Sequence, residues 1–186
     1  MPSIDINFLK LLKDDITKYP IFIETGTFNG DSTFSVEPYF NKVYTIEVSE
    51  RYYNSTKSRY RGNKIDFLLG DSSIVFEKLL PSIKNSAIIF LDGHWSSEDT
   101  GKGTKDCPLI EEINHINNLY KYRAIIIIDD FRLFEKGPKE GVNEDWTDIN
   151  KNKIINILSG RISNIYHLDS QIAKDDRLII HINSSE

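Results

Sequence analysis

Two adjacent aspartates, Asp129 and Asp130, follow directly after four consecutive isoleucines at 125–128. Neighbouring carboxylates repel each other unless a cation, a proton or a shared ligand lies between them. A third acid, Asp92, ends another apolar run, and His94 follows it two residues later. Side chains of these types could hold a divalent cation through their oxygens, or could remove a proton from a bound hydroxyl.

A glycine turn near the N-terminus offers a second kind of chemistry. Residues 24–33 read E-T-G-T-F-N-G-D-S-T, between an apolar run and a helical pattern. Glycines at such a turn let the backbone approach a ligand closely, and a helix N-terminus favours electron-rich groups. The dinucleotide fingerprint needs a second glycine two residues after Gly26, where Phe28 stands, so a nicotinamide-dependent oxidoreductase is disfavoured. An acid followed by G-x-x-x-G is instead typical of S-adenosylmethionine binding, and a plain strand-to-helix turn is the alternative.

Acids also follow the next apolar runs. Glu47 comes about twenty residues after the glycines, the usual distance for an acid that binds a ribose 2′-hydroxyl. Asp71 either accepts a hydrogen bond from an adenine amino group or, with Ser72, caps the next helix. Because the carboxyl ends of parallel strands meet at one edge of a sheet, we expect these acids to lie near Glu24 and Asp92 at that edge.

Seven β-rich runs along the chain are candidate strands, and the residues above stand at the ends of five of them. They are expected at 21–24, 43–47, 65–69, 87–91, 124–128, 162–168 and 177–182, with helices near 31–40, 50–60, 73–82, 107–122 and 147–159. This alternation predicts a Rossmann-like, doubly wound α/β fold with a mostly parallel sheet. Only residues 169–176 separate the last two strands, so the C-terminal strand is expected to pair antiparallel as a hairpin.

Length and composition fit one domain over residues 1–186, opened by an N-terminal helix within 1–20 that Ser3 could cap. The formal net charge of -5 argues against a nucleic-acid or anionic-membrane surface. Cys107 is the only cysteine, which excludes an intramolecular disulfide and fits a cytoplasmic protein. No signal peptide or membrane-length apolar run is recognisable, so no membrane insertion is expected.

In this order, the motifs resemble those of the class I S-adenosylmethionine-dependent methyltransferases, over nearly all of the chain after Pro20. The segments F-L-D-G-H-W-S, G-K-G-T-K-D-C-P-L-I-E-E-I and I-I-I-D-D-F-R-L-F look like a bacterial and viral group associated with glycan and polysaccharide modification. A more distant similarity is to macrocin-type sugar O-methyltransferases. The resemblance implies S-adenosylmethionine as cofactor, bound by Glu24, Thr25, Gly26, Thr27, Phe28, Asn29, Gly30, Ser32, Thr33, Glu47, Asp71, Ser72 and Asp92.

The same resemblance implies methylation of a sugar hydroxyl on a glycan or a glycosylated small molecule. Macrocin-type enzymes are metal-dependent, and the positions that match their ligands are Asp92, Asp129 and Asp130, with Mg²⁺ as the expected ion. His94 departs from the pattern, because distant relatives tend to have an acid there, and it is left available as a base. The acidic cluster would therefore act through a metal or as a general base.

Contacts with the acceptor are expected from the loops that follow the fourth and fifth strands. The candidate residues are Trp95, Lys105, Asp106, Phe131 and Arg132. The alternative function is a cofactor-binding, non-catalytic domain of a larger glycan-assembly protein, which the long stretches at 93–106 and 131–146 disfavour. A homo-oligomer is a further possibility.

Overall fold

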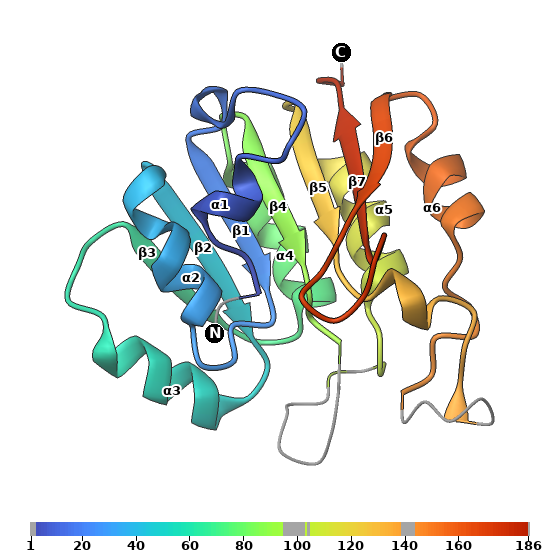
Figure 1. Cartoon of the computed structure of the whole chain (residues 1–186). Helices are drawn as coiled ribbons and strands as arrows, with labels where there is room; N and C mark the ends of the chain where they lie inside the picture. Colours follow the sequence, from blue (N-terminus) through green and yellow to red (C-terminus); the bar gives the residue numbers. More distant parts are fainter. Residues whose placement is uncertain (1–2, 95–102, 104, 139–143, 186) are drawn as a thin grey trace.

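The computed structural model describes residues 3–94, 103, 105–138 and 144–185. They form a seven-stranded sheet in the order β3-β2-β1-β4-β5-β7-β6, covered by helices on both faces (Figure 1). The strands are β1 (Ile21–Thr25), β2 (Lys42–Glu47), β3 (Ile65–Leu69), β4 (Ala87–Leu91), β5 (Ala124–Ile128), β6 (Ile162–Leu168) and β7 (Arg177–Ile182). The helices are α1 (Ile6–Leu9), α2 (Asp31–Val36), α3 (Glu50–Arg59), α4 (Ser72–Ser82), α5 (Leu109–Leu119) and α6 (Lys151–Leu158), with 3-10 turns at Ile16–Lys18, Glu37–Tyr39 and Phe131–Leu133.

The sheet is parallel from β3 to β5 and antiparallel beyond. Because Ile21 pairs with both Lys42 and Ala87, the central strands start level and their carboxyl ends share one edge. Strand β7 lies between β5 and β6 and is antiparallel to both. The predicted mostly parallel sheet with an antiparallel C-terminal hairpin is therefore confirmed.

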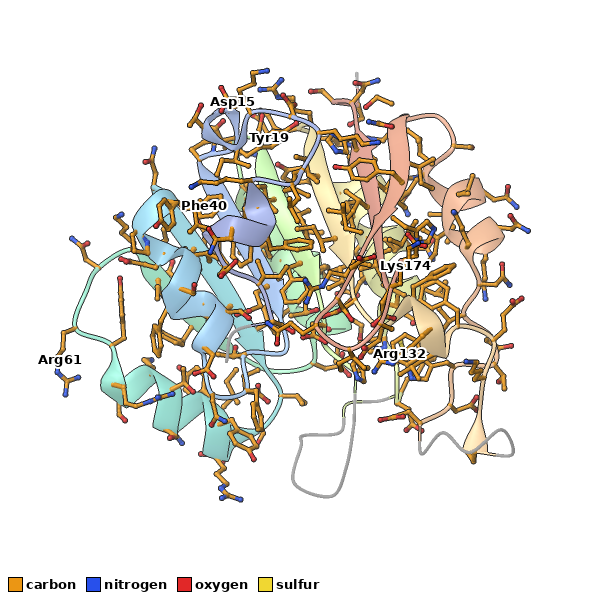
Figure 2. All side chains as sticks on the ribbon, viewed as in Figure 1. Asp15, Tyr19, Phe40, Arg61, Arg132 and Lys174 are labelled. Atoms are coloured by element: carbon orange, nitrogen blue, oxygen red, sulfur yellow. The ribbon has the colours of Figure 1, made fainter. Side chains whose placement is uncertain are left out.

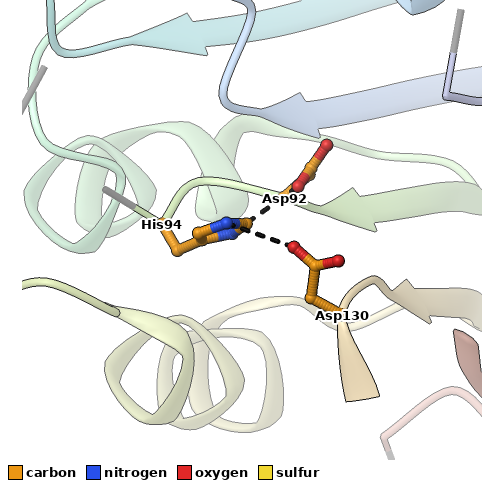
Figure 3. A group of neighbouring side chains, drawn as sticks. All are labelled: Asp92, His94 and Asp130. Atoms are coloured by element: carbon orange, nitrogen blue, oxygen red, sulfur yellow. Dashed lines mark ion pairs between the residues drawn. The ribbon is translucent and has the colours of Figure 1, made fainter. Parts of the chain in front are cut away.

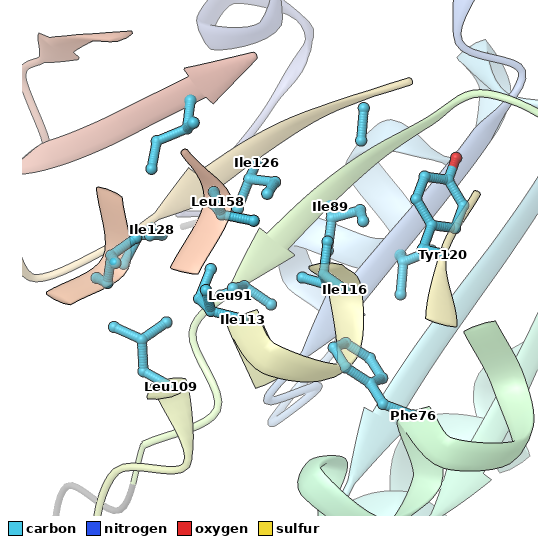
Figure 4. Close-up of a cluster of buried hydrophobic side chains, with 14 of the residues drawn as sticks. Phe76, Ile89, Leu91, Leu109, Ile113, Ile116, Tyr120, Ile126, Ile128 and Leu158 are labelled. Carbon is cyan, nitrogen blue, oxygen red and sulfur yellow. The ribbon is translucent and has the colours of Figure 1, made fainter. Parts of the chain in front are cut away.

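Strand β5 shows why four isoleucines stand in a row. Ile125 and Ile127 pack into the apolar layer beneath the N-terminal segment, whereas Ile126 and Ile128 pack against α5 and α6 (Figure 4). Each is at most 1% exposed. Burying such a side chain contributes about 1.5–3 kcal/mol, so a central strand covered on both faces favours an unbroken apolar run.

The N-terminal segment differs from the prediction, because its helix is a single turn. Asp5, and not Ser3, caps α1 by accepting a hydrogen bond from the Phe8 amide at 2.9 Å. After Leu9 the chain tightens into shorter hydrogen-bonded turns, such as Leu12 N to Leu9 O at 3.2 Å. The apolar residues of this segment are buried against the sheet, namely Ile4, Phe8, Leu9 and Leu12. Their spacing therefore reflects this burial and does not require a continuous helix.

Side chains around this segment divide between core and surface in the usual way. Tyr19 and Phe40 lie against the sheet and are buried, whereas Arg61 points away from the molecule (Figure 2). No helix within the described ranges is long and apolar enough to cross a bilayer.

Candidate active site

A pocket of about 230 Å³ lies at the carboxyl ends of β1, β2, β3 and β4, which are neighbours in the sheet. This is the edge at which open α/β sheets bind their ligands. Eight residues expected at the site line it: Gly26, Phe28, Glu47, Asp71, Ser72, Asp92, His94 and Lys105. Seven other described residues, which the sequence did not indicate for the site, also line it: Ile46, Val48, Tyr52, Gly70, Gly93, Gly103 and Pro108.

Close packing at the turn after β1 requires a glycine at position 26. Gly26 has φ 82°, and a Cβ added there would lie 2.3 Å from the Asp92 carbonyl oxygen, so only glycine fits. Its N–H donates to the Ile46 carbonyl oxygen at 2.9 Å. The turn thus joins the ends of three strands and brings the backbone to the pocket wall.

Glu24 lies beneath this turn and does not line the pocket. It is 1% exposed, and its Oε2 accepts hydrogen bonds from the hydroxyls of Thr33 and Thr45, the second at 2.8 Å. Burial raises the pKa of Glu24 to about 7, against the opposing effect of the two threonines. Other predicted cofactor residues are also absent from the pocket wall, namely Thr25, Thr27, Asn29, Gly30, Ser32 and Thr33.

Glu47 faces the pocket with its carboxylate held in place. Its Oε2 accepts from the Phe28 N–H and its Oε1 from the Ser49 N–H, both at 2.8 Å. A carboxylate oxygen has two acceptor sites, so each oxygen keeps one for a ligand hydroxyl. Phe28 adopts φ 46°, uncommon for a bulky residue, and its ring centroid lies 4.5 Å from that of Tyr52. Tyr52 was missed because nothing in the sequence distinguishes it from Tyr53.

Asp71 caps α4, as one of its two predicted roles required. Its Oδ1 accepts from the Ser73 N–H at 2.9 Å and from the Ser73 hydroxyl at 2.6 Å. It also lines the pocket, where Gly103 approaches so closely that a Cβ on the glycine would lie 2.5 Å from Asp71 Oδ2. Capping and a place at the pocket are therefore compatible.

At the other end of the pocket, His94 lies between two carboxylates (Figure 3). Its Nε2 is 3.1 Å from Asp130 Oδ2, and its Nδ1 is 3.6 Å from Asp92 Oδ1. One atom from each of the three side chains lies within 4.8 Å of the others. Removal from water, followed by the charges of Asp129 and Asp130, raises the pKa of Asp92 well above that of an ordinary carboxyl.

Asp129 is held by partners outside this group. Its Oδ1 accepts from Arg177 Nε at 3.2 Å, and its Oδ2 accepts from the Ser3 hydroxyl at 3.4 Å. Asp130 adopts a left-handed conformation, φ 58° and ψ 35°, which ends the strand alternation and separates the two side chains. Asp130 pairs instead with His94 and Arg132. Within the described ranges, Asp129 groups with Asp130 and Asp176, and not with Asp92 and Asp130 as a ligand set.

The residues expected at the acceptor occupy several environments. Phe131 packs against Phe134 and His167, with ring centroids 4.7 and 4.4 Å away. Arg132 pairs with Asp130 and Asp176. Both side chains therefore have partners within the protein, and neither lines the pocket.

Two further acceptor candidates lie in the segment that precedes α5. Lys105 lines the pocket and pairs with Glu111, and Asp106 accepts a hydrogen bond from the Asp145 N–H at 3.3 Å. Trp95 lies outside the described residues. Trp146, which the sequence analysis missed, packs edge-on against His94 with 5.0 Å between ring centroids.

Comparison with known proteins supports the fold. No family model matches the chain, and no curated protein matches its sequence. Among solved structures, the magnesium protoporphyrin IX methyltransferase of Synechocystis PCC 6803 with bound SAH has a TM-score of 0.60 at 16% identity, over 95% of this chain and 79% of its own. The N-methyltransferase NodS of Bradyrhizobium japonicum WM9, in complex with S-adenosyl-L-homocysteine, has a TM-score of 0.53 at 13% identity, over 89% and 78%. An rRNA methylase of Streptococcus thermophilus gives 0.52 at 17%, over 91% and 89%. The chain therefore has the fold of these three methyltransferases.

Proposed function

We propose that the protein is an S-adenosylmethionine-dependent O-methyltransferase. The observation that carries this proposal is that one pocket is lined both by Glu47, at a strand end where an acid can bind a ribose, and by Asp92 and His94, whose side chains can accept a proton. A cofactor and an acceptor hydroxyl bound in that pocket would lie side by side. Methyl transfer needs such alignment, because the sulfonium carbon must meet the acceptor oxygen in line.

Cofactor binding would use the carboxyl ends of β1, β2 and β3. The free acceptor sites of Glu47 suit the two ribose hydroxyls, and the Gly26 turn lets the backbone approach the ligand. Asp71 lies at the next strand end, where it can accept from an adenine amino group while it caps α4. Tyr52 and Phe28 add an aromatic wall on the same side of the pocket.

Proton removal would depend on His94. A sugar hydroxyl is too weak an acid to ionise freely at neutral pH, so a base within hydrogen-bond reach is needed. Asp130 Oδ2 lies 3.1 Å from Nε2, which orients the imidazole. Nδ1, on the Asp92 side, is then the nitrogen that takes the proton.

A divalent cation is the other route to the same ionisation. Asp92, His94 and Asp130 each offer one ligand atom, and these atoms lie within 4.8 Å of one another, a spacing at which they could share a metal. An imidazole in the set favours a first-row transition metal over magnesium, which prefers all-oxygen sites. Asp129 is engaged by Arg177 and would not join this set. A metal held there would lower the pKa of the acceptor hydroxyl.

The acceptor we propose is a sugar hydroxyl of a glycan or of a glycosylated small molecule. This choice follows the resemblance of the motifs around Asp92 and Asp129 to glycan-modifying enzymes. The structural neighbours differ in their acceptors, a porphyrin in one case and rRNA in another, so the shared fold does not select among acceptors.

Calorimetry with S-adenosylmethionine tests the cofactor, and transfer of a labelled methyl group to a panel of oligosaccharides and nucleotide sugars tests the reaction. We expect binding in the micromolar range. Absence of binding at millimolar cofactor would refute the proposal, and normal binding with no methylation of any acceptor would favour the non-catalytic alternative. Thorough chelation separates the two routes, since turnover that survives it leaves His94 acting without a metal.

A further inference from the structure

A buried carboxylate, Glu112, lies directly behind the pocket and has no part in the mechanism above. It is in α5, whose other buried residues are Leu109, Ile113 and Ile116, all apolar. Glu112 is 1% exposed, and no ion pair among the described residues includes it. Burying a carboxylate without a cationic partner is costly, so a compensating interaction is expected at this position.

The hydrogen bonds of Glu112 connect it to three strand ends. Its Oε1 accepts from the Ser72 hydroxyl at 2.5 Å, and Ser72 is part of the pocket wall. It also accepts from the Thr25 hydroxyl, whose oxygen in turn accepts from the Asp92 N–H at 3.3 Å. A Cβ placed on Gly93, another wall residue, would lie 3.4 Å from Glu112 Oε1. The carboxylate is therefore one backbone thickness from the pocket.

A cation in the pocket would give Glu112 the positively charged neighbour that the described residues do not provide. Burial raises the pKa of Glu112 to about 7, against the hydroxyls of Ser72 and Thr25, and the nearby charges of Asp71 and Glu111 raise it further. A positive charge at the pocket wall favours the ionised form. S-adenosylmethionine carries such a charge on its sulfonium, whereas the demethylated product has a neutral sulfide.

We propose that Glu112 is a positioning residue that makes the pocket prefer the cationic cofactor to the neutral product. This inference rests on the proposed function. Glu112 holds the hydroxyls of Ser72 and Thr25 in fixed orientations, and its negative charge stabilises the sulfonium across the thin wall at Gly93. The charge disappears from the ligand when the methyl group leaves, so the product does not receive this stabilisation and binds less tightly than the cofactor.

The two ligands allow a direct test, because they differ only in one methyl group and one charge. Dissociation constants for S-adenosylmethionine and S-adenosylhomocysteine are measured by calorimetry at pH 8 for the wild type, Glu112→Gln and Glu112→Met. We expect both variants to lose about tenfold in the preference for the cation, the size of effect that one buried charge produces over a short distance. Glu77→Gln, which removes the same charge from an exposed position of α4, should keep the wild-type ratio.

Each outcome has a separate meaning. If the wild type binds neither compound, the proposed function fails and this inference fails with it. If the wild type binds both, and a cooperatively folded variant keeps the wild-type ratio, the inference is overturned while the function stands. Methionine has nearly the shape of glutamate and introduces no new polar group, so Glu112→Met decides the question if Glu112→Gln does not fold.

Discussion

The two adjacent aspartates should behave in opposite ways when they are replaced. Asp129 forms a buried ion pair with Arg177, in which the side chains are 7% and 3% exposed. Arg177 also donates to the Ser3 carbonyl oxygen at 2.7 Å, and its guanidinium lies 4.4 Å from the centre of the Phe8 ring. The pair therefore fastens the N-terminal segment to the sheet, and Asp129→Asn should act mainly on stability.

The expected loss follows from the burial of the pair. Removing one partner of a buried ion pair leaves an uncompensated charge and costs about 3–5 kcal/mol. For a chain of this length that corresponds to a fall in Tm of roughly 6–20 °C. Asp129→Asn should thus unfold at clearly lower urea concentration while the folded fraction retains cofactor binding. The double variant Asp129→Leu, Arg177→Met should recover much of the loss, because no charge is then left buried.

Asp130→Asn is the matched comparison, since it makes the same change one residue later. Its carboxylate pairs with His94 and with the partly exposed Arg132. We expect a stability loss of about 1 kcal/mol or less, as for an ion pair that water can reach, and a loss of methyl transfer of at least about a hundredfold. Denaturation and turnover are measured on both variants. A small stability loss in Asp129→Asn, or equal losses in both, would refute the division of roles.

Three further predictions concern the pocket and the buried carboxylate beneath it. Gly26→Ala should abolish cofactor binding, because a Cβ would collide with the Asp92 carbonyl, whereas Gly160→Ala, where a Cβ meets nothing within 4 Å, should bind normally in the same calorimetric titration. Glu47→Gln should weaken binding by roughly tenfold to a hundredfold, the value of charge-assisted hydrogen bonds to ribose, and a 2′-deoxyribose cofactor analogue should show a smaller penalty in the variant than in the wild type. Glu24 has a pKa raised from 4.5 to about 7 by burial, so the folded state binds its proton more tightly than the unfolded state. The contribution of Glu24 to the free energy of unfolding should be fully present below pH 4.5 and should fall by about 3 kcal/mol as the pH rises through 7. Glu24→Gln should therefore flatten the decrease in Tm between pH 5 and 8. An unchanged slope would contradict the assignment of this pKa to Glu24.

The strands could be predicted because each leaves a strong local signal. Apolar runs such as 124–128 are buried on both faces of the sheet, and a short run of that kind between two helical patterns is typical of a central strand. The N-terminal helix could not be predicted in the same way. Its apolar spacing is satisfied by any segment that packs along the sheet. Asp5 sets the start of the helix, and the chain leaves the helical hydrogen-bond pattern after Leu9.

At the site, partners far apart in the sequence were beyond prediction. Arg177 is 48 residues from Asp129, and only the pairing of β7 beside β5 brings them together. Glu112 is different, because the sequence did contain a signal. It comes three residues after Leu109 and four before Ile116, which places it on the apolar stripe of α5. A lone acid in that stripe is a buried acid, and its neighbour Glu111, off the stripe, pairs with Lys105 near the surface.

The repulsion between Asp129 and Asp130 is resolved by backbone geometry more than by a shared ligand. Asp129 continues the strand, since its N–H donates to the Leu91 carbonyl oxygen, and it therefore follows Ile125 and Ile127 to the face where Arg177 lies. A regular strand would send Asp130 to the opposite face, and its left-handed conformation instead turns it toward His94 at the sheet edge. Each carboxylate thus meets its own basic partner. One acid secures the fold, and the other, one residue later, faces His94 in the proposed active site.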